Sequence, residues 1–238
     1  MAVVRVQIGH YQRTRGNTGA SNRELDITEQ SLNKALADQI AANALARPVA
    51  GVTFEFVGAD EKKYGSPDIF IALHMDGAVR EGANGPSVGY PPSSASSQRF
   101  AQIWKNRREL LDGPSAFRAD NYTTGLSRYY GYGTAWSGTA PVKMVLENGF
   151  TTNNADARWA MLNRSAVADS VIDSCAQYLS RSRVDAAAPA ASPAHAAPTV
   201  DDLLAVRRSV NQAWKLQGES RDSLKQARAD LDALIDPN

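Results

Sequence analysis

The chain of 238 residues is 43% hydrophobic and 21% charged, and its 26 basic and 25 acidic residues give a formal net charge of +1. This composition is typical of a soluble globular protein, and the near-neutral charge gives no indication of nucleic-acid binding. No run of 18 apolar residues occurs, which excludes insertion into a membrane as a helix. The first residues lack a charged leader followed by a long apolar region, so we expect a protein made in the cytoplasm.

The pattern of apolar residues predicts alternating strands and helices. In chain order we expect strand 3–9, helix 28–45, strands 52–58, 69–75 and 86–90, helix 97–111, strand 142–147 and helix 155–180. Thr28 is the expected N-cap of the first helix, and the lone Cys175 is expected to be a buried small hydrophobe. Alternation of this kind favours an α/β fold with a mainly parallel, twisted sheet flanked by helices. We expect this domain to occupy residues 1–182.

A linker and a short helical appendage are predicted after this domain. Residues 183–199 are rich in Ala and Pro, and their prolines block a continuous helix. His195 lies in this linker and is expected to have no functional role. Residues 200–238 return to a heptad spacing of apolar residues, with Gly218 near the middle. This pattern fits one coiled-coil helix or a hairpin of two short helices; we prefer the hairpin, and either form needs a partner surface.

Two of the three histidines, His10 and His74, each follow an apolar, strand-like run. Two carboxylates are placed in a similar way: Glu24 follows a polar loop, and Glu147 follows another apolar run. Zinc hydrolases bind their metal through three such side chains and leave a fourth position for water. The spacing alone leaves an ordinary structural role open, because a His after a strand is often a satisfied core residue and Glu24 could simply favour a helix N-terminus.

Four sequence blocks in one order carry a more specific signal. They are Val6-Gln-Ile-Gly-His10, Gly19-Ala20 with Arg23-Glu24-Leu-Asp-Ile-Thr28, Asp68-Ile-Phe-Ile-Ala-Leu-His74-Met-Asp76, and Ala140-Pro-Val-Lys-Met-Val-Leu-Glu147-Asn-Gly-Phe150. These blocks resemble the zinc-dependent N-acetylmuramoyl-L-alanine amidases of the amidase-3 family. The likeness spans residues 3–150 and continues as a helical pattern to about residue 180.

The resemblance implies roles for individual residues. His10, Glu24 and His74 would be ligands of Zn²⁺, and Glu147 would be the catalytic carboxylate. Glu29 is a second carboxylate near Glu24 and ranks behind it as a ligand. The implied reaction is hydrolysis of the amide bond between N-acetylmuramic acid and L-alanine in bacterial peptidoglycan. Because the chain lacks a leader, we expect a phage lysis enzyme, an endolysin, that acts on the cell wall after its release from the cytoplasm. Its C-terminal helices are expected to self-associate or to bind the wall.

The chain departs from the family pattern in two loops. The loop after His10 carries Tyr11 and Gln12 where the family has glycines, and Arg13 and Arg15 follow as candidates to meet anionic wall groups. The segment 58–67 is short and lacks a helix that is usual in the family. Asp76 is a candidate to orient a ligand.

An aromatic run interleaved with glycines is a candidate lining for a glycan groove, although we expect half of it to be packing. Its members are Tyr122, Tyr129, Tyr130, Tyr132 and Trp136. Two alternative functions stay open: a zinc peptidase that cleaves the peptidoglycan stem peptide, and a non-catalytic protein that binds the cell wall.

Overall fold

The computed structural model describes residues 1–13, 16–78, 82–181 and 183. Its elements in chain order are β1 (Ala2–Ile8), β2 (Ser21–Asn22), β3 (Ile27–Thr28), α1 (Glu29–Ala46), β4 (Val52–Gly58), β5 (Ile69–Asp76), β6 (Ser87–Gly89), α2 (Ala95–Glu109), α3 (Thr124–Ser127), the 3-10 turn η1 (Tyr130–Tyr132), α4 (Thr134–Ser137), β7 (Val142–Phe150), α5 (Asn154–Leu162) and α6 (Arg164–Tyr178).

A five-stranded sheet in the order β4-β1-β5-β7-β6 forms the centre of the described residues. Strands β4, β1, β5 and β7 are parallel, and β6 is antiparallel to β7 at one edge. The predicted α/β fold with a mainly parallel sheet is therefore confirmed. Because β1, β5 and β7 are parallel, their carboxyl ends meet at one edge of the sheet, where open α/β sheets usually bind ligands.

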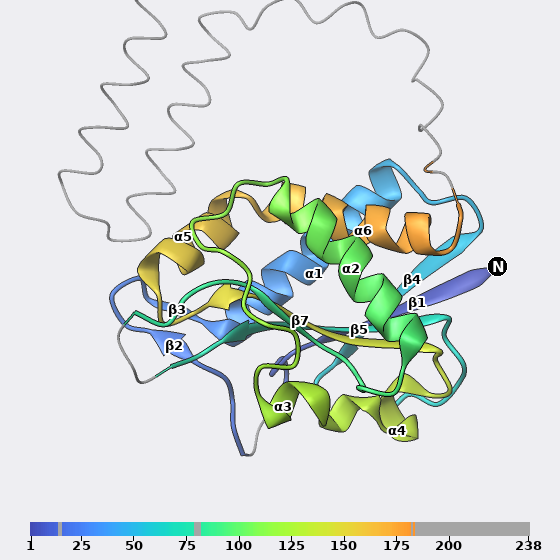
Figure 1. Cartoon of the computed structure of the whole chain (residues 1–238), viewed down its shortest axis with the longest axis horizontal. Coiled ribbons are helices and arrows are strands. Elements are labelled where there is room, and N and C mark those ends of the chain that lie inside the picture. Colours follow the sequence, from blue (N-terminus) through green and yellow to red (C-terminus); the bar gives the residue numbers. More distant parts are fainter. Residues whose placement is uncertain (14–15, 79–81, 182, 184–238) are drawn as a thin grey trace, which may run out of the picture. The chain divides into compact units, whose positions relative to one another are not determined.

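Helices cover both faces of the sheet (Figure 1). The side chains of strand β5 are accordingly buried on both sides of the sheet. Ile69, Ile71 and Leu73 pack into the larger core with α1, α2 and α6. Phe70 and Ala72 point to the other face and pack into a smaller core beneath α3 and α4. A strand buried on both faces reads as a continuous apolar run, which is the pattern that predicted it.

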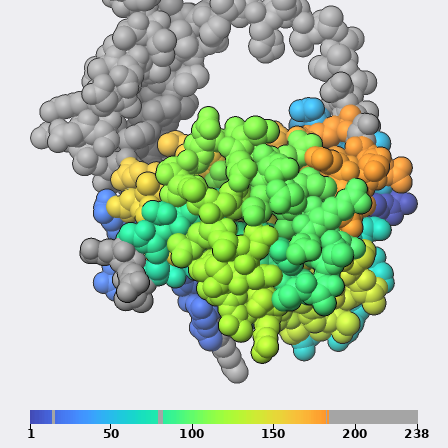
Figure 2. Space-filling view, in the orientation of Figure 1, coloured from blue at the N-terminus to red at the C-terminus, as the bar shows by residue number. Residues whose placement is uncertain are grey.

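Segment 77–141 connects β5 to β7 and contributes β6, α2 and the short helices. In Figure 2 helix α2 and the segment after it, both green, form much of the visible surface. Trp104 of α2 is fully buried and makes an edge contact with Phe117, the two rings being 5.5 Å apart. This segment therefore packs tightly onto the sheet and can place side chains at its carboxyl edge.

The predicted element positions agree with the structure within a few residues, with two exceptions. The expected helix 155–180 is two helices, α5 and α6, because the chain breaks at Asn163, whose φ and ψ are −101° and 16°. The small hairpin β2–β3 and the turns α3, η1 and α4 were not predicted, since elements of two to four residues carry no periodic pattern.

The body of the fold extends to Arg183. Its guanidinium lies 2.6 Å from a carboxylate oxygen of Asp169 and 3.1 Å from one of Asp173. Apart from Arg183, the predicted linker 183–199, which contains His195, and the heptad tail 200–238 lie outside the described residues, so those expectations stay predictions. Cys175 is fully buried in the larger core, as expected. None of the described helices is both long enough and apolar enough to span a membrane.

Candidate metal centre

Three buried side chains converge at the carboxyl edge of the sheet. His10 lies two residues after β1, His74 lies near the end of β5, and Glu29 is the first residue of α1. Each offers one ligand atom, and these atoms all lie within 4.8 Å of one another. The strand and helix ends thus gather a His–Glu–His group of the kind that holds metal ions.

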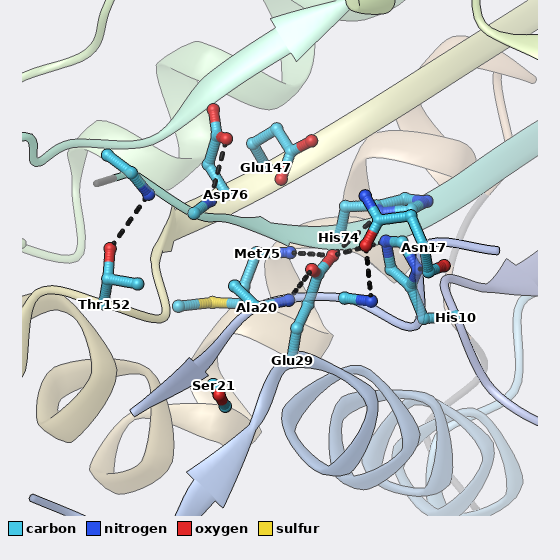
Figure 3. A pocket seen from close by; sticks show the side chains of 13 residues that line it. His10, Asn17, Ala20, Ser21, Glu29, His74, Met75, Asp76, Glu147 and Thr152 are labelled. Atoms are coloured by element: carbon cyan, nitrogen blue, oxygen red, sulfur yellow. Dashed lines mark hydrogen bonds and ion pairs between the residues drawn. The ribbon is translucent and has the colours of Figure 1, made fainter. Parts of the chain in front are cut away.

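The start of helix α1 fixes Glu29. The Thr28 hydroxyl caps the helix by accepting from the Ser31 amide at 3.1 Å, and the Ser31 hydroxyl accepts from the Thr28 amide at 3.1 Å. The Glu29 carboxylate accepts backbone N–H bonds from Ala20 at 3.0 Å and Met75 at 3.2 Å. Figure 3 shows this carboxylate rising from the helix toward His74. Its orientation is therefore set by three separate chain segments.

The electrostatic balance keeps Glu29 ionised. Burial disfavours its charged form, but the hydrogen bond and charge of His74, together with the charge of His10, outweigh burial and lower the pKa of Glu29. A buried carboxylate held in the charged form is suited to bind a cation.

His74 lies between two partners. Its Nδ1 is 2.9 Å from Oε1 of Glu29, and its Nε2 is 3.0 Å from the hydroxyl of Tyr129. The backbone of Gly9 passes close to the ring: a Cβ added there would lie 2.6 Å from two ring atoms of His74. Glycine before His10 therefore lets the two histidines approach, with ring centroids 5.0 Å apart.

His10 is held in a left-handed backbone conformation with φ of 58°. Its Nδ1 lies 2.9 Å from the carbonyl oxygen of Asn17, which can only accept, so Nδ1 carries the proton. The lone pair of Nε2 then faces Glu29, 3.4 Å from Oε1. Burial lowers the pKa of His10, with the opposing charge of Glu29 unable to reverse the shift, so the neutral form that can ligate a metal is favoured.

The donor set fits a divalent metal ion. Imidazole nitrogen and carboxylate oxygen are ligands that zinc and its neighbours in the transition series share. Two further carboxylates, Asp76 and Glu147, line the same pocket, which has a volume of about 400 Å³. In Figure 3 they lie above the Glu29 carboxylate, at the strand ends. A cation among three carboxylates would relieve their mutual repulsion.

Glu147 enters the pocket from β7, where it pairs in register with His74 of β5. A bulge after this pair separates His74 from Asp76 in the ladder. Glu147 is 8% exposed, and within the described residues its Oε2 is buried without a hydrogen-bond partner. Burial, with the charges of Asp76 and Glu29, raises the pKa of Glu147 well above its ordinary value. It is a carboxyl group poised to exchange a proton.

The structure does not bring Glu24, the expected third ligand, to the two histidines. Glu24 is exposed and lies in the turn between β2 and β3, whereas Glu29 occupies the place beside His10 and His74. The two short strands cannot be recognised by periodicity, and their hairpin turns Glu24 away from the sheet edge. The sequence does contain one signal for Glu29. It directly follows the expected N-cap Thr28, which predicts it to be the first residue of the helix.

The residues of the aromatic run do not line this pocket; most of them pack against the smaller core or hydrogen-bond residues around the site. Tyr122 donates a hydrogen bond to Asp76, and Tyr129 contacts His74. Tyr130 accepts from Arg13 at 2.6 Å, and Arg13 also pairs with Asp60 at 2.9 Å. Tyr122, Tyr129, Tyr132 and Trp136 pack against the smaller core. Arg15 lies outside the described residues.

No protein-family model and no curated protein matches the sequence. Several solved structures do. The catalytic domain of an N-acetylmuramoyl-L-alanine amidase, CwlV, from Bacillus (Paenibacillus) polymyxa var. colistinus is 18% identical with a TM-score of 0.57, over 76% of this chain and 100% of that one. An N-acetylmuramoyl-L-alanine amidase of Nostoc punctiforme is 16% identical with a TM-score of 0.54, over 76% of this chain and 98% of that one.

The catalytic domain of an endolysin targeting Clostridia difficile is also similar, being 16% identical with a TM-score of 0.53 over 74% of this chain and 98% of that one. At such identities these likenesses show a shared fold. The chain thus contains a nearly complete catalytic-domain fold of the kind found in these amidases.

Proposed function

We propose that this chain is a peptidoglycan hydrolase that cleaves the amide bond between N-acetylmuramic acid and L-alanine. The observation that carries the proposal is the buried group His10, Glu29 and His74, which shares one pocket with Glu147. The amidase fold of the solved neighbours and the four ordered sequence blocks support the same reaction. The proposal replaces Glu24 by Glu29 as the third ligand.

His10, Glu29 and His74 would hold a zinc ion, since their donor atoms converge and the set leaves a fourth position open. The chemistry that zinc supplies in such a centre is polarisation of a carbonyl and a lower pKa of water. The other parts of the reaction fall to the side chains of this protein.

Glu147 is the proposed general base and acid. Its unpartnered Oε2 and raised pKa suit a group that takes a proton from the attacking water and gives it to the leaving amine. A C–O bond then forms at the lactyl carbonyl and the C–N bond to L-alanine breaks. The products are a muramic acid carboxylate and a peptide with a free N-terminal alanine.

The products of purified peptidoglycan test this reaction. We expect the enzyme to release new N-terminal alanine, detectable by amine labelling and mass spectrometry, and a chelator to abolish the release. Cleavage within the stem peptide would instead expose another N-terminus and identify a peptidase. A protein that binds peptidoglycan and releases no fragment would be the non-catalytic alternative.

We further propose that the biological role is lysis of a bacterial host by a phage enzyme made in the cytoplasm. The endolysin among the structural neighbours supports this assignment. Bacteria producing the protein should then lyse only after their inner membrane is permeabilised. Lysis without permeabilisation would indicate export, and a different role.

A further inference from the structure

A line of hydrogen bonds connects the sheet to the ring of His74. The side-chain nitrogen of Gln7, a fully buried residue of β1, donates to the carbonyl of Ala59 at 3.0 Å. The Gln7 side-chain oxygen accepts from the hydroxyl of Tyr129 at 2.8 Å. The same hydroxyl lies 3.0 Å from Nε2 of His74. The line therefore ends on a proposed metal ligand.

The direction of every bond follows from the first one. Because the Ala59 carbonyl can only accept, the nitrogen of the Gln7 amide faces it and the oxygen faces Tyr129. The single hydroxyl proton of Tyr129 is then donated to Gln7. The hydroxyl oxygen can then only accept from His74, so Nε2 of His74 carries a proton. Without a metal ion, Nδ1 hydrogen-bonds the Glu29 carboxylate at 2.9 Å. With an ion bound, Nδ1 would be the ring nitrogen free to ligate it, because Nε2 keeps its proton.

Packing holds Tyr129 in this position. A Cβ added to Gly131 would lie 2.5 Å from the Tyr129 ring and 3.0 Å from the Gln7 side-chain oxygen, so glycine is needed beside this bond. The ring of Tyr129 also meets that of His74 edge-on, with centroids 5.3 Å apart.

We propose that Tyr129, oriented by Gln7, is a positioning residue that fixes the tautomer of His74 required for metal binding. The inference rests on the metal centre of the proposed function. It adds a residue from the segment between α2 and β7, which lies outside the four sequence blocks. Partners that orient a ligating histidine are commonly worth about 10- to 100-fold in metal affinity.

The test measures zinc affinity by chelator competition in the full-length protein. Tyr129→Phe keeps the ring and removes the hydroxyl, and we expect the dissociation constant to rise at least about tenfold. Tyr132→Phe is the matched control, because its hydroxyl bonds the Leu126 carbonyl at 2.9 Å and lies off the line. This control should stay within about twofold of the wild type.

A second variant tests the direction of the bonds. In Gln7→Met, Tyr129 loses the acceptor for its proton and can donate it to Nε2 of His74, which favours the wrong tautomer. The Ala59 carbonyl keeps its hydrogen bond from Tyr130 at 2.9 Å. Zinc affinity should therefore fall in Gln7→Met as well, and the double variant with Tyr129→Phe should lose less than the sum of the two effects.

Nitrogen-15 NMR of the zinc-loaded protein gives a readout that a purely structural role would not move. The Nε2 proton of His74 should exchange slowly in the wild type and rapidly in Tyr129→Phe. The Nδ1 proton of His10, which bonds Asn17, should stay protected in both and serves as the internal reference.

The outcomes separate this inference from the metal centre itself. Equal zinc affinities in the wild type and Tyr129→Phe, or equal losses in Tyr129→Phe and Tyr132→Phe, would overturn the positioning role. A wild-type protein that binds no zinc would overturn the metal centre as well.

Discussion

Glu147 of β7 and His74 of β5 are register partners on adjacent parallel strands, a few residues before the carboxyl ends of both strands. This pairing places the proposed general base next to a proposed ligand, and both residues lie on strands rather than on loops. Positions on strands hold functional side chains more precisely than positions on loops. The register of the sheet is therefore the link between the fold and the proposed chemistry.

Glu147→Gln is expected to abolish hydrolysis while leaving metal binding unchanged. The amide has a similar shape but cannot take a proton from water, so turnover should fall by at least about 100-fold. Release of N-terminal alanine and zinc content, measured on the same sample, check the two parts. Activity close to that of the wild type would refute the role of Glu147, and loss of zinc would make it a ligand instead.

The same substitution should change how the stability of the metal-free protein depends on pH. The pKa of Glu147 is raised above its ordinary value of 4.5, so between the unfolded and folded values the native state binds more protons than the unfolded state. Its contribution therefore lowers the free energy of unfolding as pH rises through this range. The glutamine variant lacks this contribution.

Urea denaturation in the presence of a chelator checks this prediction. Glu147→Gln should gain stability relative to the wild type as pH rises from below 4.5 to neutral. A difference between the two proteins that does not vary with pH would show that Glu147 does not titrate in this way.

Asp156 is expected to stabilise the end of β7. Its buried carboxylate accepts from the Gly85 amide at 2.7 Å, the Phe150 amide at 3.0 Å and the Ser115 hydroxyl at 2.9 Å. Asp156→Ala leaves these donors without their acceptor, and should cost about 3 kcal/mol of unfolding free energy. Thermal and urea denaturation measure the loss.

Asp38→Ala is the matched control for that measurement. Asp38 is an exposed helix residue whose partner is Lys34, four residues earlier. Surface pairs of this kind contribute little, so the control should unfold close to the wild type. Equal losses in the two variants would contradict the special role of Asp156.

The sequence was sufficient to predict the elements with a clear period. The apolar runs of β4 and β5 and the spacing in α1 predicted these elements within one or two residues, and Thr28 is the N-cap that was expected. The break at Asn163 was missed because the helical spacing continues on both sides of it. Local pattern therefore predicts elements better than their interruptions.

The site was predictable where a residue ends a long strand. His10 follows β1, His74 and Glu147 lie near the ends of β5 and β7, and the structure brings all three to one pocket. The third ligand, Glu29, was not predicted correctly, because the hairpin that separates Glu24 from Glu29 has strands of only two residues. Tyr129 bonds Gln7 across 122 positions, a contact that only the folded chain creates.

The metal content of two glutamate variants tests the central claim most directly. Glu29→Gln removes the carboxylate beside His10 and His74, whereas Glu24→Gln changes an exposed residue of the β2–β3 turn. After loading with zinc and exhaustive dialysis, we predict one ion per chain in the wild type and in Glu24→Gln, and a large loss in Glu29→Gln. Zinc retained by Glu29→Gln and lost from Glu24→Gln would contradict the proposed centre.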